Sequence, residues 1–429
     1  MAREYDCGDE SFSPEEQRSL KYLNYPGRPQ VMKASLAIDG GWLHQNEDNS
    51  VSIKDKETGE TVRIDERYQY SMVEITLEGL NIALVDAEKG VTLREKLNGE
   101  IEKYYADPNR YGHYVYYPDK GMFVHYASRR MHQLALVASS SRLLQHPDKK
   151  MSWEETRDIL SKVTPGIAGA SVGNSIAHTL SMTLGCQSLK IADPSPFKLT
   201  NLNRVRAGFL DIKWSEEQAV VQGTFDGSKN KAVTTAQQIH SKDPFVRISA
   251  YDEGVKGFNV ESFVDGNRCE SKCTCIIEET DDLNTKVELR EECRRKGVRL
   301  IMVTDAGSIA HVGIRPFDTD PNATLAYGAS DDELYSKLRD YNLRGDKESF
   351  FGVADLLIGP HYKRDEFKGI IDGKIQRVFA SIAQLGSTAM TGSGIVTEVI
   401  ARTALGHKYP EGFMLDQKNL ELISWGEEV

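Results

Sequence analysis

The chain has no excess of positive charge, few cysteines and no long apolar run, and each scarcity removes a class of protein. Its 429 residues include 53 Lys and Arg against 64 Asp and Glu, which gives a net charge of −11. A protein dedicated to DNA or RNA normally carries a net basic surface, so we expect no nucleic-acid partner. Six cysteines in a chain of this length do not form a disulfide framework, which favours a reducing, cytoplasmic location.

Two segments without any Asp, Glu, Lys or Arg, 163–189 and 378–397, raise the question of a membrane. Both are rich in Gly, Ser, Thr, Asn or Gln, whereas a spanning helix needs about 20 mainly apolar residues. We therefore expect soluble segments that pack through small residues, and no membrane partner. The opening Met-Ala-Arg-Glu-Tyr-Asp is charged and has no apolar stretch, so we expect no secretory signal.

Residues 1–120 are expected to form a small α+β domain, with partner or substrate recognition as a candidate role. Hydrophobic residues make up 39% of the chain, enough for packed cores, and the length allows two or three domains. A helical pattern covers 92–105, where Thr92 can act as the cap. Alternating patterns predict three hairpins, at 51–53 with 62–64, 72–77 with 81–85, and 114–117 with 122–124.

Residues 121–429 are expected to form a doubly wound α/β domain with a mainly parallel sheet and a C-terminal extension. From about residue 150, strand-like and helical runs alternate, which is typical of βαβ units. In such a domain a nucleotide binds at the carboxyl ends of the strands. The predicted strands lie at 188–192, 245–250, 275–277 and 298–303, and the predicted helices at 231–240 and 283–295.

A run of small residues at 166–173, Gly-Ile-Ala-Gly-Ala-Ser-Val-Gly, predicts a phosphate-binding turn. It opens a helix, where small side chains let backbone amides approach a phosphate. Twenty residues after Gly173, Asp193 ends a predicted strand, where nucleotide-binding α/β folds place the acid that holds ribose hydroxyls. Tight packing of helix on strand also explains the glycines, and Asp193 could instead cap the turn that follows it.

The next segment, Asp193-Pro-Ser-Pro-Phe-Lys-Leu-Thr-Asn-Leu-Asn-Arg204, resembles an element of the ThiF/MoeB/HesA family, the ubiquitin-activating-enzyme-like adenylyltransferases. In that family the element reads D-x-D-x-(three)-S-N-L-x-R. The resemblance continues with Lys231-Ala232, which opens a helix ending before Asp243-Pro244. It also includes Glu279-Thr-Asp-Asp-Leu-Asn-Thr-Lys286, which is similar to the family's C-T-D-N-x-x-x-R. A late helix of small residues from Gln384 extends the match, and the main elements cover about a third of the chain.

The resemblance implies a Rossmann-like adenylation domain that activates a carboxylate with ATP and releases pyrophosphate. Such a reaction needs positioning and positive charge rather than a protein nucleophile. The acyl substrate would be a peptide or the C-terminus of a small modifier-like protein, or a small acid. The residues that would hold the nucleotide are Gly169, Ser171, Gly173, Asp193 for the ribose, Asn201 and Arg204 for the phosphates, and Lys231 for the triphosphate.

The family likeness also implies a metal ion and a second subunit. Asp281 would bind the Mg²⁺ that bridges ATP and the acyl substrate. Arg142, with Arg129 and Arg130 as further candidates, would reach the ATP of the partner in a homodimer. Asp282 could be the metal ligand instead of Asp281, and either aspartate could cap the next helix. Arg204 and Lys231 could be solvated charges at helix ends, and Arg142 could be an ordinary surface arginine.

Three departures from the family pattern raise other functions. Ala168 replaces the first glycine of the turn, Ser195 replaces the second acid, and 213–229 is inserted between Arg204 and Lys231. These departures favour a degenerate member that acts as a binding or scaffold subunit. A nicotinamide-dependent oxidoreductase is the alternative that keeps the fold and changes the chemistry.

The cysteines do not predict a metal site. Cys269, Cys273 and Cys275 are close in sequence, but structural zinc usually uses two C-x2-C pairs, so we expect no structural zinc. Cys293 is the one cysteine beyond the Asp281 strand, where a thioester cysteine would be expected. It lies four residues from Leu289 on a predicted helix, which favours core packing.

Overall fold

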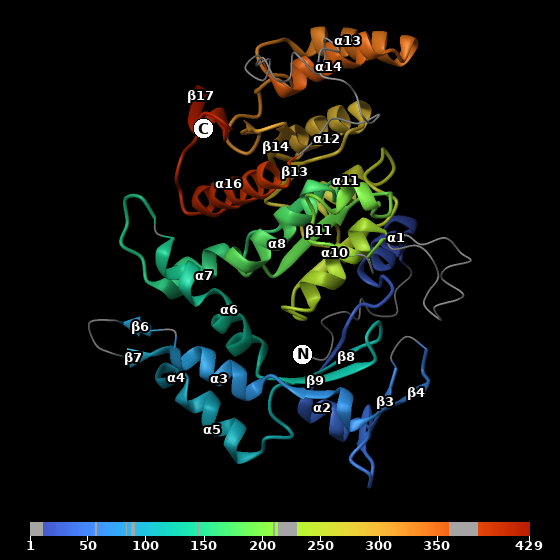
Figure 1. Cartoon of the computed structure of the whole chain (residues 1–429), viewed down its shortest axis with the longest axis vertical. Coiled ribbons are helices and arrows are strands. Elements are labelled where there is room, and N and C mark those ends of the chain that lie inside the picture. Colours follow the sequence, from blue (N-terminus) through green and yellow to red (C-terminus); the bar gives the residue numbers. More distant parts are fainter. Residues whose placement is uncertain are drawn as a thin grey trace.

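The computed structural model describes residues 12–429 except 56–57, 83, 87–90, 145, 209–210, 213–229 and 360–384. Its central element is a sheet of eight strands (Figure 1). In spatial order these are β12 (Arg247–Tyr251), β11 (Ser188–Ala192), β10 (Pro165–Ala168), β13 (Cys275–Glu278), β14 (Arg299–Ala306), β15 (Ile309–Arg315), β16 (Pro410–Asp416) and β17 (Glu421–Glu428). The first five run parallel, and each of the last three is antiparallel to its neighbour.

Helices cover both faces of this sheet, and this is why its inner strands are apolar on both sides. Ile167 of β10, for example, pairs with Ile191 and Ile277 on the two neighbouring strands. One face packs against α7 (Trp153–Leu160), α8 (Val172–Leu184), α10 (Lys231–His240) and α16 (Gly386–Ala404). The other packs against α1 (Pro14–Leu23), α11 (Val260–Asp265), α12 (Leu283–Lys296), α13 (Asp331–Arg344) and α14 (Lys347–Ile358). The predicted doubly wound, mainly parallel α/β fold is confirmed.

The direction of winding reverses between β10 and β13. From β10 the chain moves outward through β11 to β12, then returns through α11 to β13 and continues to β14 on the other side. The crevice at such a reversal, outside the carboxyl ends of the strands, is where open α/β sheets bind ligands. The candidate active site lies here.

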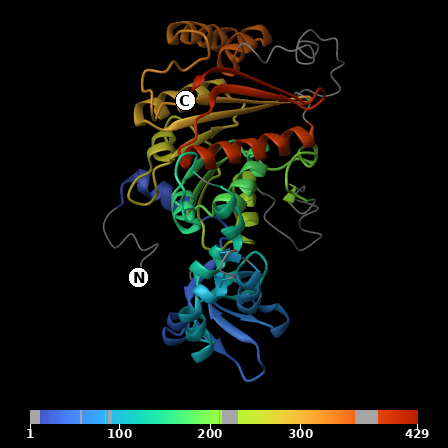
Figure 2. The ribbon, with the colours of Figure 1, turned by 90° about the vertical axis from the view of Figure 1, so that its left-hand side faces the viewer.

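The N-terminal part contains three smaller sheets, below the large sheet in Figure 2. The first consists of β1 (Gln30–Lys33), β8 (His113–Tyr117), β9 (Met122–Tyr126) and β5 (Gln69–Ser71). The other two are formed by β2 (Leu43–Gln45), β3 (Val51–Lys54) and β4 (Thr61–Ile64), and by β6 (Leu84–Asp86) and β7 (Val91–Thr92). The helical segments here are α2 (Ala34–Asp39), η1 (Glu66–Tyr68), α3 (Val73–Ile82), α4 (Leu93–Lys96), α5 (Asn98–Ala106) and α6 (Arg129–Leu143).

The predicted hairpin at 72–85 is wrong, whereas the other two are confirmed. β3 pairs with β4 and β8 pairs with β9, as expected. Residues 73–82 instead form α3, because Val73, Leu77 and Leu80 are spaced for one helical face and are all buried against α6. The helix predicted over 92–105 is present as α4 and α5, with a break at Leu97.

A domain boundary at residue 120 would divide the β8–β9 hairpin, whose turn contains that residue. The first helix also lies away from the rest of the N-terminal part. Tyr22 of α1 stacks on Tyr251 of β12 with ring centroids 3.9 Å apart, and Ser19 donates a hydrogen bond to Glu270. Figures 1 and 2 show α1 beside the large sheet. A boundary after β9 keeps the hairpin intact, and the domain division stays a prediction.

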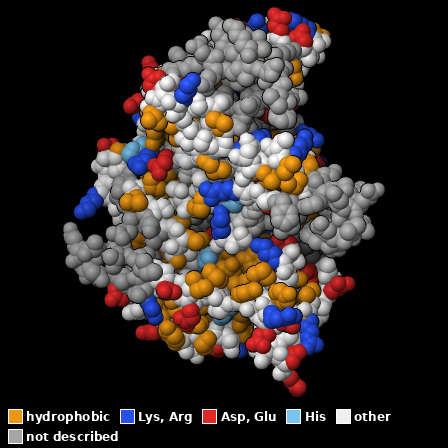
Figure 3. Space-filling view, in the orientation of Figure 1, with side chains coloured by type: hydrophobic (Ala, Val, Ile, Leu, Met, Phe, Trp, Pro, Cys, Tyr) orange, Lys and Arg blue, Asp and Glu red, His pale blue; other side chains and the backbone are white. Residues whose placement is uncertain are grey.

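The face of the molecule in Figure 3 carries charged side chains of both signs. On the face seen in Figure 3, Lys and Arg side chains are interspersed with Asp and Glu side chains. No helix within the described ranges is long and apolar enough to cross a membrane.

One buried ion pair holds the segment after β15 on the sheet. Arg290 of α12 and Glu278 of β13 are both fully buried, and Arg290 Nε and Nη2 donate to Glu278 Oε2 at 2.9 and 2.8 Å. The same guanidinium donates to the carbonyl oxygens of Leu325 and Leu357, at 2.6 and 3.0 Å. Four contacts therefore tie α12, β13 and α14 together.

We expect Arg290→Met to lower the free energy of unfolding by about 3 kcal/mol or more, because Glu278 keeps only Lys286 as a cationic partner. The control is Arg402→Met, which breaks an exposed pair with Glu398 and should change stability little. Urea unfolding followed by circular dichroism measures both variants. Equal, small losses would contradict the role given to the Arg290 pair.

Candidate active site

The small-residue run forms a tight turn at the carboxyl end of β10. Gly169 has φ +105°, and a Cβ there would lie 2.6 Å from the backbone carbonyl of Glu279 at the end of β13. A Cβ on Gly173 would lie 2.7 Å from Ile167 Cγ2, so this glycine lets α8 start close to β10. Packing within the chain therefore accounts for both glycines, and the turn they form faces the switch point. Ala168 is fully buried, and its methyl group packs in the core on the α12 side.

Asp193, directly after β11, joins the turn to two other segments. Its Oδ2 accepts the backbone N–H of Ala170 at 2.9 Å, and the ammonium group of Lys231 lies 3.4 Å from the same oxygen. Its Oδ1 accepts the backbone N–H and the hydroxyl of Ser195, at 2.8 and 2.6 Å. An ionised carboxylate offers about four lone-pair positions, and all four are engaged within the chain.

Hydrogen bonds with neighbouring residues hold Lys231 in place at the start of α10. Asn230 caps α10, its Oδ1 accepting the N–H groups of Ala232 and Val233, while its Nδ2 donates to the carbonyl of Asp193 at 2.7 Å. Lys231 Nζ donates to Ser195 Oγ at 3.0 Å. The residue that replaces the family's second acid thus bridges Asp193 and Lys231.

Arg204 lies in the loop after β11 that rests on the first turns of α8. Asn174 Oδ1 accepts the N–H of Arg206 at 2.8 Å, and Ser175 Oγ donates to the carbonyl of Arg204 at 3.3 Å. Arg204 Nη1 donates to the carbonyl of Thr200 at 2.8 Å. These contacts hold the Arg204 backbone on α8 and the guanidinium within its own loop, where the side chain is half-buried.

Two of the predicted residues use their side chains on local backbone. Asn201 Oδ1 accepts the N–H of Lys198 at 2.9 Å, within its own loop. Asp282 caps α12 by accepting the N–H of Thr285 at 2.7 Å, which is the capping role considered for it. Asp281 is exposed and follows β13 at the switch point.

Two further acids, Glu279 and Asp305, lie at the same strand ends and were not among the predicted site residues. Burial raises the pKa of Asp305 to about 7, with the Arg204 charge acting in the opposite direction. Burial and the charges of Asp305 and Asp281 raise the pKa of Glu279 well above its usual range. Burial lowers the pKa of Arg204, which Asp281 and Asp305 partly offset. In the sequence, Asp305 is marked only by its place at the end of an apolar strand, whereas Glu279 is the first residue of the quoted motif and was given no role there.

Several buried polar atoms at this edge have no hydrogen-bond partner among the described residues. They are Ser171 Oγ at the start of α8, Arg204 Nε, Glu279 Oε1 and both carboxyl oxygens of Asp305. Buried polar atoms are normally paired, so this group fits a polar ligand. Among the described residues, no three His, Cys, Asp or Glu side chains are arranged to hold a metal ion. Mg²⁺ is usually held by one or two carboxylates together with substrate phosphates. The acids at this edge provide carboxylates of that kind.

Two features predicted from the sequence, the Arg142 contact across a dimer and the insertion at 213–229, lie outside the described residues. Arg142 belongs to α6, but its side chain lies outside the described residues, as does the whole inserted segment 213–229. Arg129 and Arg130 form the first turn of the same helix.

The five described cysteines are buried and form no disulfide: Cys186, Cys269, Cys273, Cys275 and Cys293. Burial raises the pKa of the Cys273 thiol to about 11 and that of Cys293 well above its usual value. Buried, protonated thiols are poor nucleophiles and poor metal ligands.

The sheet order and the helices on both of its faces define a Rossmann-like α/β fold. The model of the ThiF family matches residues 149–415, and the chain belongs to that family. The family predicted from the segment between Asp193 and Arg204 is therefore confirmed.

Comparison with individual proteins gives more distant likenesses. The uncharacterized protein MT1398 of Mycobacterium tuberculosis (strain CDC 1551 / Oshkosh) is 26% identical over 258 residues, which is 60% of this chain. The match spans only 32% of that relative's length. PaaA is similar with a TM-score of 0.45 and 16% identity, over 70% of this chain and 82% of that chain. E. coli MccB gives a TM-score of 0.42 with 13% identity, over 65% of each chain. E. coli tRNA N6-threonylcarbamoyladenosine dehydratase, TcdA, gives 0.40 with 15% identity, over 64% and 95%.

The raised pKa of Asp305 predicts how stability depends on pH. An aspartate titrates near 3.9 in an unfolded chain and near 7 at this site, so the folded state binds more protons between those values. Asp305 therefore makes the protein less stable as pH rises through this window. We expect Asp305→Asn to remove this decline and to be more stable than wild type above about pH 7, by on the order of 4 kcal/mol.

Urea unfolding at several pH values between about 5 and 8 measures the difference between the two proteins. The variant Asp332→Asn, at an exposed position on α13, is the control and should follow the wild-type slope. Parallel curves for wild type and Asp305→Asn would contradict the burial argument.

Proposed function

We propose that the chain adenylates a carboxylate with ATP and releases pyrophosphate. The observation that supports this proposal is that two acids follow strands β11 and β13 and that each has a cation near it. Lys231 and Arg204 supply the positive charge, and Asp193 and Asp281 supply the carboxylates. Membership of the ThiF family supports the same chemistry.

In the reaction a substrate carboxylate oxygen bonds to the α-phosphorus of ATP, while the bond from that phosphorus to the pyrophosphate oxygen breaks. Negative charge develops on phosphate oxygens, so fixed positive groups accelerate the step and no protein nucleophile is needed. When bound, Mg²⁺ would neutralise part of the phosphate charge, and Asp281 would hold it.

Lys231 is suited to contact the triphosphate without being reoriented. Its ammonium group has three N–H donors, and the contacts with Asp193 and Ser195 account for two of them. Arg204 has an unpartnered Nε, and burial keeps its charge incompletely solvated. A phosphate near these two groups would replace lost hydration with charge-assisted hydrogen bonds.

The proposals for the substrate, the oligomeric state and the cellular location rest on the family. We propose that the carboxylate belongs to a peptide, a small modifier-like protein or a small acid, that the enzyme acts as a homodimer, and that it acts in the cytoplasm. Arg142 of one subunit would complete the site of the other.

A binding or scaffold subunit is the second candidate. It is favoured by the full use of the Asp193 oxygens within the chain and by the local hydrogen bond of Asn201. Under this alternative the same fold would bind a protein partner and would not turn over ATP. Exchange of ³²P-labelled pyrophosphate into ATP, with candidate carboxylates present, distinguishes the two functions.

Two neighbouring aspartates provide a matched pair for this assay. We expect Asp281→Asn to reduce pyrophosphate exchange on the order of a hundredfold, because it removes the charge that a hard cation needs. Asp282→Asn should retain most activity, since Asn caps a helix as well as Asp does. If Asp282→Asn is the inactive variant, the metal ligand is assigned one position too early.

If each active site of the homodimer contains residues from both subunits, mixing two inactive variants should restore activity. Arg142→Ala and Asp281→Asn each remove one contribution to the same composite site. In a statistical mixture of equal amounts, about a quarter of all sites should contain both native residues, as two-fold symmetry requires. We expect exchange activity to return to about that fraction after verified subunit exchange. A monomeric mass in solution, or no rescue, would refute the shared site.

A further inference from the structure

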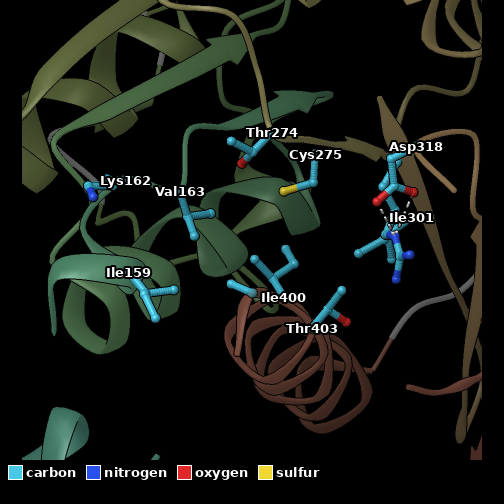
Figure 4. Close-up of a pocket in the computed structure, with 11 residues that line it drawn as sticks. Ile159, Lys162, Val163, Thr274, Cys275, Ile301, Asp318, Ile400 and Thr403 are labelled. Carbon is cyan, nitrogen blue, oxygen red and sulfur yellow. Dashed lines mark hydrogen bonds and ion pairs between the residues drawn. The ribbon is translucent and has the colours of Figure 1, made fainter. Parts of the chain in front are cut away.

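A pocket of about 340 Å³ lies at the amino ends of the parallel strands, whereas the candidate active site lies at their carboxyl ends (Figure 4). Thr274 and Cys275 stand at the amino end of β13, and Arg299 begins β14. The floor and walls come from α7, the segment after it, and the end of α16. The pocket is lined by Ile159, Lys162, Val163, Thr274, Cys275, Arg299, Ile301, Asp318, Ile400, Thr403 and Ala404.

Most of this lining is apolar. Ile159, Val163, Ile301 and Ile400 point side chains toward the space from α7, the segment after it, β14 and α16, respectively. Pockets of this size with apolar walls and a few placed polar groups are typical of small-molecule sites.

Two polar atoms of the lining residues have no hydrogen-bond partner in the part of the chain that the structure describes. Arg299 has 5% of its surface exposed, and its Nη1 is buried without a hydrogen-bond partner. Thr403 Oγ1 is buried and unpartnered as well. Asp318 holds the other side of the guanidinium, with its two carboxyl oxygens 2.9 and 3.2 Å from Arg299 Nε. Figure 4 shows Thr403 and Asp318 toward one end of the pocket and Lys162 at the other.

We propose that this pocket binds a small carboxylic acid with an apolar body. The carboxylate would accept hydrogen bonds from Arg299 Nη1 and Thr403 Oγ1, the two donors left unpaired at one end. Its body would lie along the isoleucine and valine side chains. The charges of Lys162, Arg299 and Asp318 sum to one positive charge, which matches a monoanion rather than a dianion.

The pocket is distinct from the candidate active site, because it opens at the amino ends of the strands. One helix nevertheless reaches both places. A Cβ on Gly386, the first residue of α16, would lie 2.2 Å from the carbonyl oxygen of Asn203, beside Arg204. The last turn of the same helix supplies Ile400, Thr403 and Ala404 to the pocket.

Calorimetric titration of the full chain with octanoate, octanamide and octyl phosphate tests the ligand class, with hexanoate and decanoate as length variants. We expect saturable binding of one carboxylate per chain, at least tenfold tighter than the amide of the same length. No saturable binding of any of the three carboxylates would overturn the proposal. Equal binding of octanamide, or tighter binding of octyl phosphate, would overturn the assignment of a monoanionic carboxylate.

The location is tested with two threonines that share one property. Thr403 and Thr234 both carry a buried, unpartnered hydroxyl, but only Thr403 lines the pocket. We expect Thr403→Val to weaken octanoate binding about tenfold, whereas Thr234→Val should bind like wild type. Because valine replaces a hydroxyl that makes no hydrogen bond, both variants should fold. Equal affinities for the two variants would place the ligand elsewhere.

Discussion

The carboxylate of Asp193 holds the candidate active site together. It accepts hydrogen bonds from the turn after β10 and from Ser195, and it lies against the ammonium group of Lys231 on α10. The turn and Lys231 are far apart in the sequence, and a charged acceptor binds each more strongly than a neutral one would. The glycine-containing turn, the strand end and the lysine therefore keep one arrangement before any ligand arrives. Such preorganisation is what stabilisation of developing phosphate charge requires.

The second feature of the site is a group of acids at neighbouring strand ends. Asp305 and Glu279 lie near Asp281 at neighbouring strand ends, and burial raises the pKa of both Asp305 and Glu279. Arg204, which burial deprives of hydration, is the adjacent cation. A site in this state lacks solvation for both signs of charge, and a bound phosphate with its cation would supply partners to each. The unpartnered atoms and the shifted pKa values are thus two consequences of the same burial.

Sequence patterns predicted the part of the structure in which the period of apolar residues is long and regular. The strands from β11 to β14 and helices α8, α10, α12 and α16 lie where expected. The N-terminal part was harder, because 72–77 alternates like a strand while Val73, Leu77 and Leu80 also share a helical face. Asp305 could not be found from spacing, since its burial near Arg204 arises only when β13 and β14 are neighbours. The internal use of Asn201 likewise depends on the loop conformation.

The most direct measurement of the central claim is a crystal structure of the full chain with α,β-methylene-ATP and Mg²⁺. The account predicts phosphate oxygens within hydrogen-bonding distance of Lys231 Nζ and Arg204, with the metal ion at Asp281. It also predicts that a ribose hydroxyl takes the position on Asp193 now held by the hydroxyl of Ser195. A nucleotide bound elsewhere, or none bound with all four Asp193 contacts unchanged, would contradict the assignment of this strand edge as an ATP site.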